Sequence, residues 1–195
     1  MLFTAYSQTF CFAMQTRPTW CILNQAMNWE WIIYLGMFLG VGPLAIEVAG
    51  YVWHRYVEHW GVLGQGMTFR HWIHHEVAYP ADRLRTDVYD DARSWGWYVL
   101  LGAIAGGFFL ALPMAWALAA ALGATIYGWV VINYFHAAFH VRGHGWWRMA
   151  WFRRLARLHD IHHYAPVNYG IMFFGIDRLC GTYRETFPRR DRMIF

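Results

Sequence analysis

Eleven histidines lie in this chain of 195 residues, and all of them fall between positions 54 and 163. Ten of them form four groups with short spacing: His54-x4-His59, His71-x2-His74-His75, His136-x3-His140 and His159-x2-His162-His163. Imidazole binds zinc, copper, iron and nickel, and ten imidazoles exceed what one ion needs. Because no cysteines accompany them at metal-site spacing, the pattern favours a dinuclear redox site over a structural zinc site.

The H-x2-H-H pattern occurs twice, and its spacing predicts helices. Positions i, i+3 and i+4 share one face of a helix, so each such box is expected to present three imidazoles in one direction. His136 and His140 are i, i+4 and do the same. His54 and His59 are five apart, which fits a helix with a distorted last turn.

Histidines of this kind can also be interpreted without a metal ion. A solitary histidine near a membrane is usually structural or solvated, and a histidine-rich stretch can be a pH-sensitive surface. His144, in the turn 143–145, comes nearest to this interpretation, although it lies i+4 from His140 and can also be a ligand. Two H-x2-H-H boxes and two further pairs are hard to explain in this way.

Two apolar stretches predict the helices that position the histidines. Residues 29–53 are long enough to cross a hydrocarbon core at about 20 residues per crossing. Glu47 lies inside this stretch, which predicts that one side of the helix packs against protein. Residues 95–135 contain no Asp, Glu, Lys or Arg and suffice for two crossings with a turn near Pro113. Small residues would let these helices approach closely, namely Ala103, Ala105, Ala115, Ala119 and Gly123.

Composition and charge agree with a membrane protein. Apolar residues make up 58% of the chain and charged residues 14%, against about 45–50% and about 25% in soluble domains. The formal charge is +4, and all 16 basic residues are arginines. They concentrate in the linker 54–94 and after residue 141, which places both segments, and the metal site with them, on the cytoplasmic side. No basic low-complexity tail is present, so nucleic acid is not an expected partner. An interfacial belt is the expected role of Trp53, Trp60, Trp72, Trp95, Trp97, Trp146, Trp147 and Trp151.

These observations predict an all-α integral membrane protein. We expect about three to four transmembrane helices and a cytoplasmic helical cap that holds the dinuclear metal site. Residues 28–195 would form a single domain after an N-terminal extension, residues 1–27, that lacks the pattern of a cleaved signal peptide. The spacing of Cys11, Cys21 and Cys180 predicts no disulfide framework.

Further motifs surround the histidine boxes. Asn168-Tyr169-Gly170 follows the last box, and the segment 177–183 reads Asp-Arg-Leu-Cys-Gly-Thr-Tyr. After the second box come Pro80, Asp82, Arg83 and Arg85. Over about 52–183, the chain resembles the fatty acid hydroxylase/sterol desaturase superfamily of membrane di-iron enzymes. The ending departs from that superfamily at Ile176, where a tryptophan is usual.

The resemblance implies a site and a chemistry. The implied ligands are His54, His59, His71, His74, His75, His136, His140, His159, His162 and His163. Asp160, Asn168 and Asp177 would accept hydrogen bonds from ligating imidazoles. Two iron ions, which zinc can replace during purification, would use O2 to hydroxylate or desaturate an unactivated C–H bond. A fatty acyl chain is the first choice of lipid, and a sterol or carotenoid ring is the alternative. Electrons would come from a separate ferredoxin or cytochrome b5-type donor.

Two other classes of protein remain open. A membrane electron carrier would use histidine pairs as axial haem ligands, but two to four histidines would suffice for it. A metal transporter would need ionisable residues within its spans, near the midplane. Here the histidines lie at span ends and beyond, and Glu47 lies inside a predicted span, with Glu30 at the end of the same span.

Overall fold

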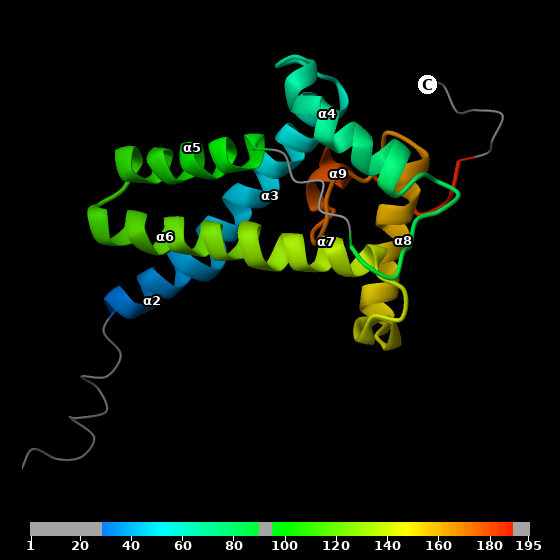
Figure 1. Cartoon of the computed structure of the whole chain (residues 1–195). Coiled ribbons are helices and arrows are strands. Elements are labelled where there is room, and N and C mark those ends of the chain that lie inside the picture. Colours follow the sequence, from blue (N-terminus) through cyan, green and yellow to red (C-terminus); the bar gives the residue numbers. More distant parts are fainter. Residues whose placement is uncertain (1–28, 90–94, 189–195) are drawn as a thin grey trace, which may run out of the picture.

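The computed structural model describes residues 29–89 and 95–188, and every regular element in these ranges is a helix. The predicted N-terminal extension lies outside the described residues. The all-helical prediction is confirmed for the part of the chain that is described, where the only β pairing is an isolated bridge between Thr86 and Val141. Figure 1 shows the long helices extending to one side and the shorter helices gathered at the other.

Three long helices form the extended part of the molecule (Figure 1). The first runs without a break through α2 (Trp29–Gly36), η1 (Met37–Val41), α3 (Gly42–Val52) and η2 (Trp53–His59). The second is α5 (Gly96–Ala111), and the third consists of α6 (Met114–Ile126), η4 (Tyr127–Ile132) and α7 (Asn133–His140). Three η segments within these helices are π-helical turns, which occur often at functional sites.

The hairpin predicted for residues 95–135 is present, with its turn at Leu112 and Pro113. Its two arms are unequal, however. The helices Trp29–His59 and Met114–His140 are long and apolar enough to cross a membrane, whereas Gly96–Ala111 has only 16 residues. At 1.5 Å per residue, the 27 residues of the third helix span about 40 Å, which exceeds a hydrocarbon core of about 30 Å. Its last turns, with His136 and His140, can therefore extend beyond the hydrocarbon.

Small residues let the first and third helices pack closely. Gly42 lies directly against the backbone of Ala120, and Gly123 lies against the backbone of Phe38, so a Cβ atom at either glycine would overlap the neighbouring helix. The alanines buried at this crossing are Ala117, Ala120 and Ala124. Close approach through Gly123 is thus as expected, but it joins α6 to the first helix and not to the other arm of the hairpin.

A stripe of apolar side chains faces outward along the third helix. Every fourth residue is exposed and apolar or aromatic: Leu118, Leu122, Ile126, Val130 and Tyr134. The first helix carries a similar exposed set, including Leu35, Leu39, Leu44, Val48 and Val52. Large exposed apolar surfaces mark sites of contact with protein or membrane. On helices of this length, the stripe fits contact with lipid chains.

The remaining helices form a cap at the C-terminal ends of the first and third helices (Figure 1). They are α4 (Gln65–Ile73), η3 (His74–Ala78), η5 (Gly145–Arg148), α8 (Ala150–Tyr164) and α9 (Gly175–Leu179). The core between the cap and α7 contains Ala138, Phe139, Phe152 and Ala156. Two of the tryptophans predicted for an interfacial belt lie elsewhere, because Trp53 is buried and Trp97 packs into the core between the long helices.

Candidate metal centre

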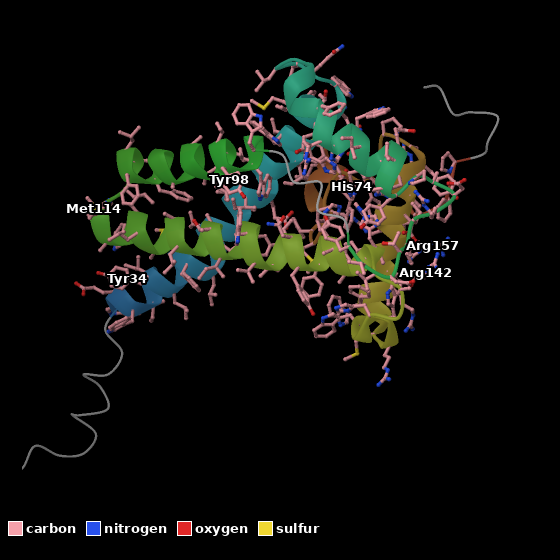
Figure 2. All side chains as sticks on the ribbon, viewed as in Figure 1. Tyr34, His74, Tyr98, Met114, Arg142 and Arg157 are labelled. Atoms are coloured by element: carbon pink, nitrogen blue, oxygen red, sulfur yellow. The ribbon has the colours of Figure 1, made fainter. Side chains whose placement is uncertain are left out.

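Ten histidines from α4, α7, α8 and the π-helical segments η2 and η3 meet where the cap joins the long helices. Figure 2 shows His74 in the middle of this region. In each of the following groups, the candidate ligand atoms lie within 4.8 Å of one another. The first histidine group contains His54, His59, His71, His75 and His162. The second histidine group contains His74, His136, His140 and His159. His163 forms a third set with His74 and His75.

The two H-x2-H-H boxes are divided between these groups. Although each box is helical, as predicted, it does not direct three imidazoles to one point. His71 and His75 belong to the first group, while His74 belongs to the second. Likewise, His162 belongs to the first group and His159 to the second. Because α4 and α8 pass between the two groups, each box contributes to both.

The irregular spacing of His54 and His59 is explained by a π-helical turn. The η2 segment, Trp53–His59, closes hydrogen bonds over five residues instead of four. Residues five apart therefore lie on the same face, and the two imidazole centroids are 5.1 Å apart. This confirms the predicted distortion of the last turn and shows that it aligns the pair.

Backbone carbonyls fix the orientation of four imidazoles. His54 Nδ1 lies 2.6 Å from the Tyr169 carbonyl, and His140 Nδ1 lies 2.8 Å from that of Leu84. In the same way, His162 Nδ1 approaches the Val167 carbonyl at 2.7 Å, and His163 Nδ1 approaches the Tyr79 carbonyl at 2.8 Å. A carbonyl oxygen can only accept, so each Nδ1 carries the proton and each neutral ring presents a lone pair at Nε2.

These Nε2 lone pairs point at other imidazole nitrogens at close range. His59 Nε2 lies 3.1 Å from His162 Nε2 and 2.9 Å from His71 Nε2. In the second group, His159 Nε2 lies 3.0 Å from His140 Nε2, and it lies 3.2 Å from His163 Nε2. Since His140 and His163 both present lone pairs, a single proton on His159 cannot satisfy both contacts. A cation between the nitrogens resolves the repulsion.

Burial keeps these histidines in the form that binds metal. Desolvation, and then neighbouring imidazoles, lower the pKa of His71, His74, His75 and His159 well below the ordinary value of about 6.5. Both ring nitrogens of His74, together with His75 Nε2 and His159 Nδ1, are buried without a hydrogen-bond partner in the described chain. Neutral, unpaired, converging imidazoles are a donor set that fits iron or zinc.

The segment after the second box surrounds the second group. It supplies the Tyr79 and Leu84 carbonyls, and its Thr86 exchanges backbone hydrogen bonds with the end of α7. Arg85 donates to Asp160 at 2.6 Å. The prediction that Asp160 accepts from an imidazole is therefore wrong, because its carboxylate binds the guanidinium that holds this segment against α8. Sequence reasoning missed the carbonyls, since a backbone acceptor leaves no residue-type signal.

Asp177 and Asn168 also act through the backbone. Asp177 is fully buried and accepts from the N–H groups of Tyr169 and Gly170 and from the Thr182 hydroxyl. Asn168 donates to the Leu158 and Arg184 carbonyls. Neither side chain accepts from an imidazole, contrary to expectation. Asp177 instead holds the turn whose Tyr169 carbonyl orients His54.

Glu58 lies beside the first histidine group, and His144 lies outside all of the groups. A carboxylate that sequence reasoning did not single out, Glu58, has an oxygen 3.6 Å from His71 Nδ1; its spacing one residue before His59 was the available signal. His144 lies outside all three sets. Its Nε2 is 3.4 Å from the Tyr134 hydroxyl, and its Nδ1 accepts from the Trp146 N–H at the start of η5.

Two cavities border the histidines. A cavity of about 100 Å³ reaches His54 and His71 of the first group and His74 and His136 of the second. It continues between the long helices, where Ile46, Trp97, Ile132 and Ile171 line it. A wider cleft of about 1150 Å³ lies on the α4 side and touches His59, His71, His75, His162 and His163. Of these two spaces in the described part of the chain, the smaller one contacts members of both the first and the second group.

Comparison with known proteins adds one match. Residues 39–182, nearly three quarters of the chain, match the family model described as fatty acid hydroxylase. This range contains all eleven histidines, including those at the C-terminal ends of the first and third long helices. No curated protein and no solved structure matches the chain. Together with the two long apolar helices, the match indicates a membrane protein with oxidoreductase activity.

Proposed function

We propose that this chain, which belongs to the fatty acid hydroxylase family, is a membrane-bound di-iron oxygenase that oxidises an unactivated C–H bond of a lipid. The observation that carries the proposal is the pair of histidine groups whose neutral imidazoles converge on two points beside one shared cavity. Two adjacent ions that border one substrate site suit a reaction in which O2 and a C–H bond must meet.

The proposed ligands are the ten histidines outside the turn at His144. The first ion would be held by His54, His59, His71, His75 and His162, and the second by His74, His136, His140, His159 and His163. Bound iron would supply the one-electron chemistry with O2 that side chains cannot provide. Convergence of four or five imidazoles at each point exceeds the two axial ligands of a haem, which argues against the electron-carrier alternative.

The chain's own residues would orient the substrate and exclude water. Ile46, Ile132 and Ile171 give the cavity apolar walls that suit an alkyl chain. Tyr169 lines the same cavity, and its carbonyl holds the His54 ring. An alkyl chain placed in this cavity would bring a C–H bond next to the histidines of both groups and displace water from them.

The reaction needs electrons from outside the chain. Hydroxylation consumes O2, two electrons and two protons, and it yields the hydroxylated lipid and one water. Desaturation consumes the same reactants and yields an alkene and two waters. We propose a ferredoxin or cytochrome b5-type protein as the electron donor and a fatty acyl chain as the substrate. A sterol or carotenoid ring remains the alternative, and the metal site is proposed to face the cytoplasm.

Lipid mass spectrometry tests the proposal. Cells that express the chain are compared with cells that express the His162→Ala variant, which should lack activity. We expect lipids that gain one oxygen, or lose two hydrogens, only with the unchanged chain, and about two irons per chain after purification. Identical lipid profiles in the two strains, with the protein present and loaded with iron, would contradict the proposal.

A further inference from the structure

The cavity beside the two histidine groups has polar groups at its inner end. Away from the histidines, apolar side chains such as Ile46, Ile132 and Ile171 form most of its wall. Glu47 and Trp97 also line it. A carboxyl group and an indole N–H in such a wall need a reason, because buried polar groups are costly without partners.

Glu47 lies within the first long helix and is only 8% exposed. An ionisable side chain inside a membrane span is expensive, and such residues commonly mark a binding site or a pathway. In the described part of the chain, the Tyr127 hydroxyl donates a hydrogen bond to one Glu47 oxygen. A carboxyl group has two oxygens and several lone pairs. The single tyrosine hydroxyl therefore leaves hydrogen-bonding capacity on a carboxyl group that lines the cavity.

Trp97 is a lining residue of the same cavity. Its ring packs against Gly50, where a Cβ would lie 3.5 Å from the ring's Cη2 atom. Trp97 and Tyr127 both pack on the cluster formed by Ile46, Ala124 and Ile132. The Trp97 Nε1 atom is buried and has no hydrogen-bond partner among the described residues. An indole N–H can only donate, so this atom needs an acceptor that the chain does not provide.

We propose that the inner end of this cavity binds a hydroxyl group of the lipid substrate. The hydroxyl oxygen accepts from Trp97 Nε1, and the hydroxyl hydrogen is donated to the Glu47 carboxyl group. A hydroxyl fits because it both donates and accepts, whereas an unsubstituted hydrocarbon would leave both protein groups without partners. The inference deepens the proposed function and rests on it for the identity of the cavity as the substrate site.

The helix sets the distance between the hydroxyl and the reacting carbon. Glu47, Gly50 and His54 all line the cavity and follow one face of the first helix. His54 lies seven positions after Glu47, which corresponds to about 10 Å along the helix axis. The substrate would thus carry its hydroxyl about 10 Å from the C–H bond that is oxidised. This favours a hydroxylated lipid over an unfunctionalised hydrocarbon ring or chain.

A purely structural role for Glu47 is the competing explanation. Its bond to Tyr127 joins α3 to η4 and could serve only to hold the helices together. Under that explanation, removal of either partner lowers stability equally and leaves ligand selection unchanged. Under the proposal, the Tyr127→Phe variant keeps the carboxyl group in the cavity and therefore keeps the preference for a ligand that carries a hydroxyl group.

Photo-crosslinking with a matched pair of probes separates the two explanations. One probe is a long-chain primary alcohol with a diazirine at mid-chain, and the other is the same alkane without the hydroxyl. Purified full-length protein in detergent is irradiated with each probe, and labelled protein is counted by mass spectrometry. We expect the alcohol to label the unchanged chain about tenfold more than the alkane, which corresponds to about 1.4 kcal/mol.

The variants then assign the preference to individual groups. Glu47→Leu should reduce the tenfold preference to about one, and Trp97→Phe, which removes only the N–H, should reduce it to about threefold. Tyr127→Phe should keep it. Thr125→Val is the matched control, because the Thr125 hydroxyl bonds within its own helix at an exposed position. If Glu47→Leu does not fold, as judged by its unfolding midpoint, Trp97→Phe carries the test.

The outcomes that overturn the inference are specific. Equal labelling of the unchanged chain by the two probes would refute it. It would also be refuted if Tyr127→Phe lost the preference for the alcohol probe as fully as Glu47→Leu does. Labelling requires neither bound metal nor O2, so it is independent of turnover. An alcohol preference without any lipid oxidation would reject the proposed function alone, and oxidation without the preference would reject this inference alone.

Discussion

The first and second histidine groups use the same side chain in different surroundings. The first group is the more open: His59, His71 and His75 are half-buried and border the wide cleft on the α4 side. The second group is less exposed, since His74, His140 and His159 are each 1% exposed and only His136 is half-buried. Of the ligands proposed for the second ion, His163 alone borders that cleft. Ions in the two groups would therefore exchange with solvent by different routes.

The groups also differ in how their rings are held. In the first group, a carboxylate, Glu58, lies near His71, and the turn held by Asp177 fixes His54. In the second group, the segment after the second box supplies the Leu84 carbonyl to His140. His74 has no hydrogen-bond partner at either ring nitrogen in the described chain. Its orientation therefore depends on packing and, by our proposal, on the metal.

The largest effect should follow from His74→Ala. His74 belongs to the second group and to the set with His75 and His163, so its loss removes a shared ligand position. We expect activity to fall more than about 100-fold, because residues that merely support ligands cost about 10–100-fold, and bound metal to fall by about half or more. Metal analysis and product assays measure this.

A histidine outside the groups provides the matched control for that variant. His144→Ala should leave metal content unchanged and lower the free energy of unfolding by about 1 kcal/mol, because the bond to the Trp146 N–H at the start of η5 is lost. Full metal content and activity in His74→Ala would show that the second group is not a metal site. Metal loss in His144→Ala would show that the metal site includes His144.

Chelation should separate the two groups in time. A chelator can approach four ligands of the first ion through the wide cleft, whereas His163 is the one proposed ligand of the second ion that borders it. We expect two phases of metal release from purified protein, with the first at least about tenfold faster. Metal remaining after timed desalting gives the rates. Release in a single phase would mean that the difference in exposure between the groups does not control exchange.

Acid should destabilise the metal-free protein. The folded-state pKa of His71, His74, His159 and His162 is lowered by burial below the unfolded value of about 6.5. The unfolded chain therefore binds more protons below that pH, and the free energy of unfolding falls as pH drops. Each histidine that stays neutral contributes about 1.4 kcal/mol per pH unit.

Thermal unfolding of metal-free protein in detergent measures this dependence. The midpoint should be constant above about pH 7.5 and should decrease progressively below about pH 6.5. Added metal should shift the decrease to lower pH, because ligation competes with protonation. A midpoint that does not decrease below about pH 6.5 would show that the imidazoles bind protons equally well in the folded and unfolded states.

The smallest effect is expected for Asp177→Asn. The substitution weakens the hydrogen bonds from the Tyr169 and Gly170 N–H groups, and so loosens the carbonyl that orients His54. We expect metal affinity of the first group to fall about tenfold, with the second group unchanged. Leu179→Ala, at an exposed position on α9, is the control. An equal loss from both groups would instead indicate a general loss of folding.

Much of the fold followed from local pattern. The uncharged stretch 95–135 predicted the helical hairpin, and Pro113 its turn, because hydrophobic length and proline geometry act within a few residues. The unequal arms did not follow, since where a helix ends depends on its tertiary neighbours. Likewise, Gly123 was predicted to permit close approach, but its partner, the backbone of Phe38, became known only from packing.

The sequence alone singled out the ten histidines in four groups, because helical periodicity places i, i+3 and i+4 on one face, and it left open whether His144 joins them. The tertiary structure decided which histidine joins which group. His74 and His75 are neighbours in the chain yet fall into different groups, since α4 lies between the two points of convergence. It also decided that carbonyls, and not Asp160 or Asp177, orient the rings, because backbone acceptors are defined by where the chain passes and not by residue type.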